Sequence, residues 1–219
     1  MSNRKKALVA IMLNGVALLI LISAGLYIKL LNHKAEKPAE KPMADIILIG
    51  DSHIKDLEVR TLNYTSENCG YRLATVQSIT PVVERVAGRN PKIVLIHVGI
   101  NNFLLMPDGL PEQYVEMLKY FSPKTKIIAS AMFPPTNYFC EEMRVKNGSW
   151  VAGLNSKIVA MTADMPNVTW IDAGKSMTDQ DGFLDPEYTY DGLHLNGEGQ
   201  LIWAKHINKA IQETLRSIP

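Results

Sequence analysis

The sequence predicts an α/β protein, a three-layer α/β/α sandwich built around a mainly parallel sheet. Short, mostly apolar runs at 44–49, 92–98, 126–131 and 168–172 have the length of strands. The longer stretches between them carry apolar residues at helical spacing. A strand that is apolar along its whole length is typical of a parallel sheet that helices cover on both faces. The alternation of the two patterns therefore indicates helices packed on both sides of one sheet.

The expected elements follow one another in a regular order. The first strand, 44–49, leads into a Gly-Asp-Ser sequence, and we expect a helix over 53–60. The stretch 74–88 predicts a second helix, because apolar residues recur there every three or four positions. The remaining elements are expected as strand 92–98, helix 112–121, strand 126–131, helix 150–165, strand 168–172 and helix 197–216.

The N-terminal segment differs from the rest of the chain. Residues 7–28 contain no charged side chain and follow a basic cluster at 4–6. About 20 apolar residues span a bilayer as a helix, whereas the apolar core of a cleavable signal peptide is about 7–15 residues long. We therefore expect residues 1–31 to form a cytoplasmic tail and an uncleaved membrane anchor. Residues 32–43 are charged and proline-spaced and predict a linker, and residues 44–219 form the folded domain.

The charges that flank the apolar run bear on its orientation. The basic cluster at 4–6 favours a cytoplasmic N-terminus, and the lysines on the other side oppose it. A short tail before a large domain still indicates export of that domain. We expect a single-pass membrane protein whose folded domain is periplasmic or extracellular. The opposing lysines are Lys29, Lys34, Lys37 and Lys41.

Charge and cysteine content argue against two classes of protein. The formal net charge of +1 lacks the basic excess of a nucleic-acid-binding protein. The chain has two cysteines and no CxxC pair, so it lacks the spacing of a zinc site. Cys69 and Cys140 both lie in expected loops at one edge of the sheet. The sequence leaves open whether they form a disulfide in an oxidising compartment or remain free thiols.

Polar residues with catalytic potential follow the ends of several expected strands. Ser52 comes directly after the first strand, Asn101 follows the strand 92–98, and Asp191 and His194 lie in the loop before the last helix. Since the carboxyl ends of parallel strands meet at one edge, these side chains are expected to converge. A serine hydroxyl needs a base within hydrogen-bond reach, and histidine oriented by a carboxylate is the usual base.

These segments resemble the SGNH hydrolase superfamily, which is also called the GDSL esterases and lipases. The sequences Gly50-Asp51-Ser52, Gly99-x-Asn101 and Asp191-x-x-His194 match three of its motifs, and the resemblance extends from residue 44 to the C-terminus. It implies a flavodoxin-like sandwich that needs no metal or cofactor. It also implies a catalytic triad of Ser52, Asp191 and His194.

The resemblance further implies an oxyanion hole, the set of donors that stabilises the negative oxygen of the reacting ester. The backbone amide of Ser52 and the side-chain amide of Asn101 are expected to supply two donors. The third is expected from the segment 68–75. An ungapped match puts Leu73 where the family has a glycine, and Gly70 lies three residues earlier. Either Gly70 or Leu73 is expected to donate its backbone amide.

The same residues also allow simpler interpretations. A strand that ends in Gly-Asp-Ser can be only a turn and a helix N-cap. The presence of Asn101 and of the Asp191-x-x-His194 motif in the right order favours catalysis. His97, inside a strand, is expected to be a packed core residue. His53, beside the serine, is expected to be structural or to line the mouth of the site.

The expected function is therefore that of a serine ester hydrolase that forms an acyl-enzyme. Its location favours an O-acetylesterase on an envelope or extracellular glycan. The alternatives are a lysophospholipase, lipase or thioesterase at the membrane surface, and a non-catalytic binding module on the same scaffold. The expected partners are a small-molecule, glycan or lipid ester and the bilayer, but no nucleic acid.

Overall fold

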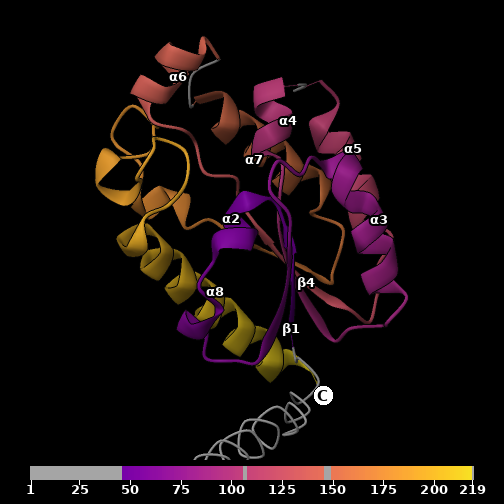
Figure 1. Cartoon of the computed structure of the whole chain (residues 1–219). Helices are drawn as coiled ribbons and strands as arrows, with labels where there is room; N and C mark the ends of the chain where they lie inside the picture. Colours follow the sequence, from indigo (N-terminus) through magenta and orange to yellow (C-terminus); the bar gives the residue numbers. More distant parts are fainter. Residues whose placement is uncertain (1–45, 106–107, 146–148, 219) are drawn as a thin grey trace, which may run out of the picture. The chain divides into compact units, whose positions relative to one another are not determined.

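The core of the structure is a parallel sheet of five strands in the order β2-β1-β3-β4-β5. The computed structural model describes residues 46–105, 108–145 and 149–218. Every neighbouring pair of strands is parallel, and helices lie on both faces of the sheet (Figure 1). The predicted α/β class and mainly parallel sheet are confirmed. The strands are β1 (Ile46–Gly50), β2 (Ser66–Gly70), β3 (Ile93–His97), β4 (Lys126–Ser130) and β5 (Val168–Ile171).

The two faces of the sheet carry separate apolar cores. Successive residues of a strand point to opposite faces, so Ile47 and Ile49 of β1 face one core while Ile46 and Leu48 face the other. The first core is covered by α3 (Val76–Ala87), α4 (Ile100–Leu105), α5 (Leu110–Leu118) and α7 (Ser149–Met161). The second core is covered by α2 (Ser52–Asp56) and α8 (Gly197–Ser217).

Some elements differ from the sequence prediction. Strand β2 was not expected, because its sequence, Ser-Glu-Asn-Cys-Gly, has no apolar run. It lies at the edge of the sheet and stays half-exposed, so burial does not require apolar side chains there. The helix expected at 53–60 ends at Asp56 and is followed by a short 3-10 turn, η1 (Val59–Thr61).

The two cysteines do not lie in loops as expected. Cys69 belongs to β2, and Cys140 is buried in α6 (Asn137–Met143), a helix that the sequence analysis missed. Neither cysteine forms a disulfide in the structure.

The expected anchor over 7–28 and the expected linker over 32–43 lie outside the described residues. Within the part of the chain that the structure describes, no helix is long and apolar enough to cross a membrane.

Candidate active site

The predicted site residues meet at the carboxyl edge of the sheet. Ser52 starts α2 directly after β1, and Asn101 lies in the first turn of α4 after β3. Asp191 and His194 come from the loop between the 3-10 turn η3 (Pro186–Tyr188) and α8. In Figure 1, α2 and α4 lie at the same end of the sheet. Segments far apart in the sequence thus bring their polar residues to one edge, as the sequence predicted.

The turn from β1 into α2 fixes the position of Ser52. A Cβ atom at Gly50 would lie 1.9 Å from the carbonyl oxygen of His97, so only glycine permits this close approach of β1 to β3. The Asp51 amide donates to the same carbonyl (3.1 Å). The Asp51 side chain caps α2 by accepting a hydrogen bond from the amide of His53 (3.0 Å). The capped turn leaves Ser52 at the start of the helix. Its hydroxyl points toward His194 in the loop between η3 and α8, which is called the late loop below.

A chain of hydrogen bonds joins Ser52, His194 and Asp191. The Oγ atom of Ser52 is 2.9 Å from Nε2 of His194, and Nδ1 of His194 is 2.6 Å from Oδ2 of Asp191. Since a carboxylate only accepts hydrogen bonds, Nδ1 carries the hydrogen. Nε2 is therefore free to accept the hydroxyl proton of Ser52.

The environment keeps Asp191 ionised. Partial burial raises the pKa of Asp191, but hydrogen bonds from the backbone and ring of His194 and from the backbone of Leu193 outweigh it and lower the pKa below its ordinary value. Its Oδ1 accepts the amides of Leu193 (3.0 Å) and His194 (2.7 Å). The aspartate thus organises the loop and also orients the imidazole.

The loop that carries Asp191 and His194 depends on a glycine between them. Gly192 has a φ of 87°, a left-handed conformation that side chains disfavour, and a Cβ there would lie 2.7 Å from Oγ1 of Thr136. Its carbonyl accepts the Thr136 amide (2.8 Å). The Thr189 hydroxyl donates to the carbonyl of His194 (2.7 Å). These contacts hold the loop in a tight turn against the start of α6.

The side-chain amide of Asn101 has one hydrogen without a hydrogen-bond partner among the described residues. Its Nδ2 donates to the carbonyl of Ala74 (2.9 Å), which occupies one of the two amide hydrogens. The neighbouring Asn102 is fully buried and turned away. Its Oδ1 accepts the Val76 amide (2.8 Å) and its Nδ2 donates to Gln77 (2.8 Å), so it holds the start of α3.

The structure separates the two candidates for the third backbone donor. The Gly70 amide donates to Oδ1 of Asn68 (2.9 Å), so its hydrogen is not available to a substrate. Leu73 lies next to Ala74, which contacts Asn101 directly. Its φ is 60°, the left-handed conformation that favours the glycine expected at this position. Within the described residues, the Leu73 amide has no hydrogen-bond partner.

Three buried side chains beneath the nucleophile form a cluster that the sequence analysis recognised only in part. Asp51, His53 and His97 are all buried, and each offers a ligand atom within 4.8 Å of the others. Both ring nitrogens of His53 already face oxygen atoms, of Asp51 (3.3 Å) and of Leu193 (3.0 Å), so the ring is not free to bind a metal. His97 packs in the core as expected, and burial lowers its pKa to about 3.

Comparison with solved structures shows the same fold in several hydrolases. A GDSL-like lipase from Bacteroides thetaiotaomicron has a TM-score of 0.64 at 21% identity, covering 77% of this chain and 87% of its own. A family 3 carbohydrate esterase from Talaromyces cellulolyticus has a TM-score of 0.60 at 16% identity, covering 80% and 99%. An acetylxylan esterase from Geobacillus stearothermophilus has a TM-score of 0.59 at 16% identity, covering 76% and 93%.

The sequence comparisons identify the family. No curated protein sequence matches the chain significantly. The family model of the GDSL-like lipases and acylhydrolases matches residues 52–202, a span that begins at the serine of the first motif and includes Asn101, Asp191 and His194. The chain therefore belongs to the GDSL-like lipase/acylhydrolase family and is an esterase of the SGNH type.

Proposed function

We propose that Ser52, His194 and Asp191 hydrolyse an ester through a covalent acyl-enzyme. The hydrogen-bonded chain from Ser52 Oγ through His194 to Asp191 carries this proposal. His194 Nε2 takes the hydroxyl proton as Oγ bonds to the carbonyl carbon, and then returns it to the leaving alcohol oxygen. His194 next removes a proton from water as the water oxygen bonds to the acyl carbon, and then gives this proton to Ser52 Oγ as the Oγ–acyl bond breaks, which releases the carboxylic acid.

The oxyanion hole in this proposal consists of the Ser52 amide, the Asn101 side-chain amide and the Leu73 amide. Preorganised donors of this kind stabilise the charge that develops on the carbonyl oxygen, by about 3–4 kcal/mol for one donor. Leu73 replaces Gly70 in the proposal, because the Gly70 hydrogen is already used within β2.

The proposed substrate is an O-acetyl ester on a glycan. The cavity that includes Ser52 and His194 measures only about 10 Å³, about the volume that one water needs, so it offers no enclosed channel for a long acyl chain. Two proteins of the same fold are described as a carbohydrate esterase and an acetylxylan esterase.

In this proposal a sugar unit of the substrate occupies a second cavity. It measures about 410 Å³ and is lined by residues of α7, of β5 and of the segments that follow β4 and β5. Its lining includes the aromatic side chain of Trp170 and the charged side chains of Asp172 and Lys175, which can bind the hydroxyl groups of a sugar.

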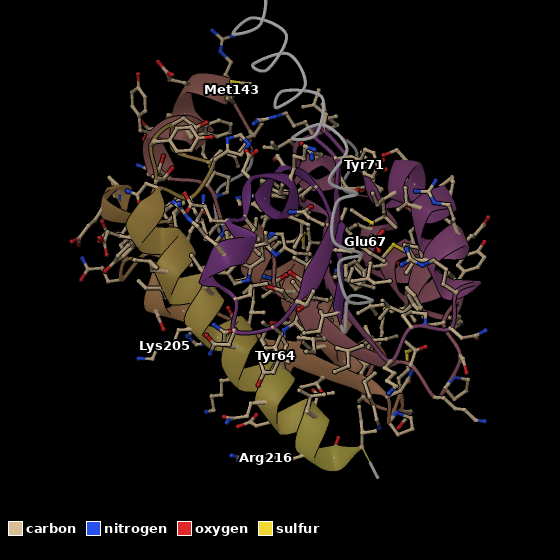
Figure 2. The ribbon with its side chains drawn as sticks, turned by 60° about the horizontal axis from the view of Figure 1, so that its bottom comes forward. Tyr64, Glu67, Tyr71, Met143, Lys205 and Arg216 are labelled. Carbon is tan, nitrogen blue, oxygen red and sulfur yellow. The ribbon has the colours of Figure 1, made fainter. Side chains whose placement is uncertain are left out.

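Exposed apolar side chains near the site favour a lipid ester as the second candidate. Leu73 is 78% exposed, and Tyr190, which stacks on His194 at 5.9 Å, is 63% exposed. Tyr71 and Met143, also exposed, lie toward one end of the domain and Arg216 of α8 toward the other (Figure 2). Such groups can bind acyl chains outside a cavity.

A panel of esters tests the proposal and separates the two candidates. We expect the wild-type protein to hydrolyse nitrophenyl acetate and acetylated oligosaccharides, with activity falling steeply beyond butyrate. Ser52→Ala should lower kcat at least about 10⁴-fold with the fold intact. A fluorophosphonate should label the wild-type protein and not the variant. Highest activity on dodecanoate would support the lipid ester, and wild-type turnover by Ser52→Ala would exclude the serine mechanism.

Membrane fractionation tests the proposed location. The full chain should stay with membranes through carbonate extraction, and protease outside spheroplasts should digest its domain. Release by carbonate would contradict the anchor. Digestion only after lysis would place the domain in the cytoplasm.

A further inference from the structure

His53 stands directly after the nucleophile and contacts the loop that carries the base. Its side chain is buried, with 4% of the residue exposed. Its Nε2 lies 3.0 Å from the carbonyl oxygen of Leu193, the residue directly before His194. Because a carbonyl oxygen only accepts, Nε2 carries the hydrogen of this bond. The neighbour of the nucleophile thus donates to the neighbour of the base across 140 positions of the chain.

On the other side of the ring, Nδ1 is 3.3 Å from Oδ1 of Asp51, the residue directly before Ser52. Because this oxygen is also an acceptor, a ring with its single hydrogen on Nε2 donates to Leu193 and not to Asp51. The ring also packs edge-on against Phe133 and His97, with centroids 5.4 and 5.1 Å away. The imidazole therefore has one fixed orientation, and its Nε2 is aimed at Leu193.

The segment Asp191–His194 makes few other hydrogen bonds to the body of the domain, although the Leu193 side chain is buried in the first core. Within the part of the chain that the structure describes, its hydrogen-bond partners beyond Thr189 and Tyr190 are Ser52, His53 and Thr136. The contact with Thr136 runs to α6, which does not carry the nucleophile. Among the hydrogen bonds of the described residues, the bond between His53 and Leu193 is thus the one that joins this loop to α2 independently of Ser52 and His194, and the rings of His53 and His194 also lie 5.6 Å apart.

We propose that His53 is a positioning residue that sets the distance between Ser52 and His194 by holding the carbonyl of Leu193. Misplacing a reacting group by about 1 Å can reduce the rate about a hundredfold. The proposal rests on the assignment of Ser52 and His194 as nucleophile and base.

Replacing His53 with glutamine or with asparagine gives a matched pair of variants, because the two amide side chains differ in length by one methylene group. In His53→Gln the amide nitrogen lies about where Nε2 lies, so it can still reach the Leu193 carbonyl. In His53→Asn the nitrogen lies nearer to the position of Nδ1 and falls short. We expect His53→Gln to keep kcat for nitrophenyl acetate within about fivefold of wild type, and His53→Asn to lose between about 10-fold and 100-fold. KM should change little in both variants, because neither removes a group that touches the ester.

His97→Leu is the control for general damage to the buried cluster. His97 is buried beside His53, but its Nδ1 bonds to Ser130 (3.2 Å) and it makes no hydrogen bond to the late loop. This variant should be less stable and yet retain kcat per folded molecule. Equal kcat in the Gln and Asn variants would overturn the proposal, and so would a loss in His97→Leu as large as that in His53→Asn.

Wild type and Ser52→Ala are measured in the same assay. If Ser52→Ala remained active, the proposed serine mechanism itself would fail. If Ser52→Ala were inactive but the His53 variants did not differ, only the role of His53 would fail.

Discussion

At the scale of single residues, adjacent positions in the sequence have different tasks. Asn101 and Asn102 are neighbours in one short helix, yet Asn101 bonds to the Ala74 carbonyl and is the proposed oxyanion donor, while Asn102 holds the start of α3. The backbone amide of Leu73 is the proposed third donor, and its side chain is largely exposed. The contacts of a residue, more than its chemical type, therefore decide whether a substitution changes the catalytic rate or the stability.

Substitution of the two asparagines should separate catalysis from stability. Asn101→Ala is expected to lower kcat about a hundredfold or more with little change in KM, because an oxyanion donor acts mainly on the transition state. Asn102→Ala leaves the buried Val76 amide unpaired and should reduce the free energy of unfolding by about 1–3 kcal/mol. Steady-state kinetics and urea unfolding of both variants test this. A larger kcat loss in Asn102→Ala would mean that the oxyanion donor is Asn102.

Leu73→Gly tests the backbone donor and its strain. A left-handed residue with a side chain is disfavoured by about 1–2 kcal/mol relative to glycine, and the exposed leucine has little packing to lose. Greater flexibility of the unfolded chain offsets part of the gain. We expect a rise in unfolding free energy of about 1 kcal/mol with unchanged kcat. Leu73→Ala, which keeps the strain, is the control and should show no gain. A marked loss of kcat in the glycine variant would argue against a preorganised amide here.

At the scale of elements, the candidate site combines the carboxyl edge of the parallel sheet with the loop that carries Asp191 and His194. Secondary structure was predictable where strands are buried on both faces, as in β3 and β4, because burial requires apolar runs there. It was not predictable for β2, whose edge position tolerates polar residues, nor for α4 and α6, which are short and belong to the site. Local sequence therefore revealed the frame of the domain better than its active edge.

Two glycines with similar backbones test the role of the late loop. Gly192 and Gly182 have φ values of 87° and 82°, but a Cβ meets Thr136 at 2.7 Å only at Gly192 and finds open space at Gly182. Gly182→Ala should lose about 1 kcal/mol of stability through strain alone and keep its activity. Gly192→Ala should also displace the turn that carries Asp191 and His194 and lower kcat at least about tenfold. Equal kinetics in the two variants would show that the loop tolerates the displacement.

At the scale of the whole molecule, a buried histidine makes folding depend on pH. Burial lowers the pKa of His97 from 6.5 to about 3, so the folded state keeps it neutral where the unfolded chain binds a proton. Stability from this group is complete above about pH 6.5 and falls as the pH decreases toward about 3. At pH 5 the loss is about 2 kcal/mol relative to neutral pH.

The measurement is thermal or urea unfolding of wild type and His97→Leu between pH 7.5 and 5. We expect the wild type to lose more stability than the variant over this range, by about 2 kcal/mol at pH 5. Parallel pH curves for the two proteins would show that His97 takes up its proton in the folded state at ordinary pH.

The sequence by itself determined the α/β class, the family motifs and the candidates Ser52, Asn101, Asp191 and His194, because buried strands and strand-end polar residues leave local patterns. Only the tertiary structure decided that the Gly70 amide hydrogen is already bonded to Asn68 and that the His53 ring bonds to the Leu193 carbonyl. It also decided that Leu73, beside the Ala74 that contacts Asn101, has a left-handed backbone. Backbone hydrogen bonds and dihedral angles depend on which segments the fold places side by side, and contacts across 140 positions leave no trace in the spacing of residues.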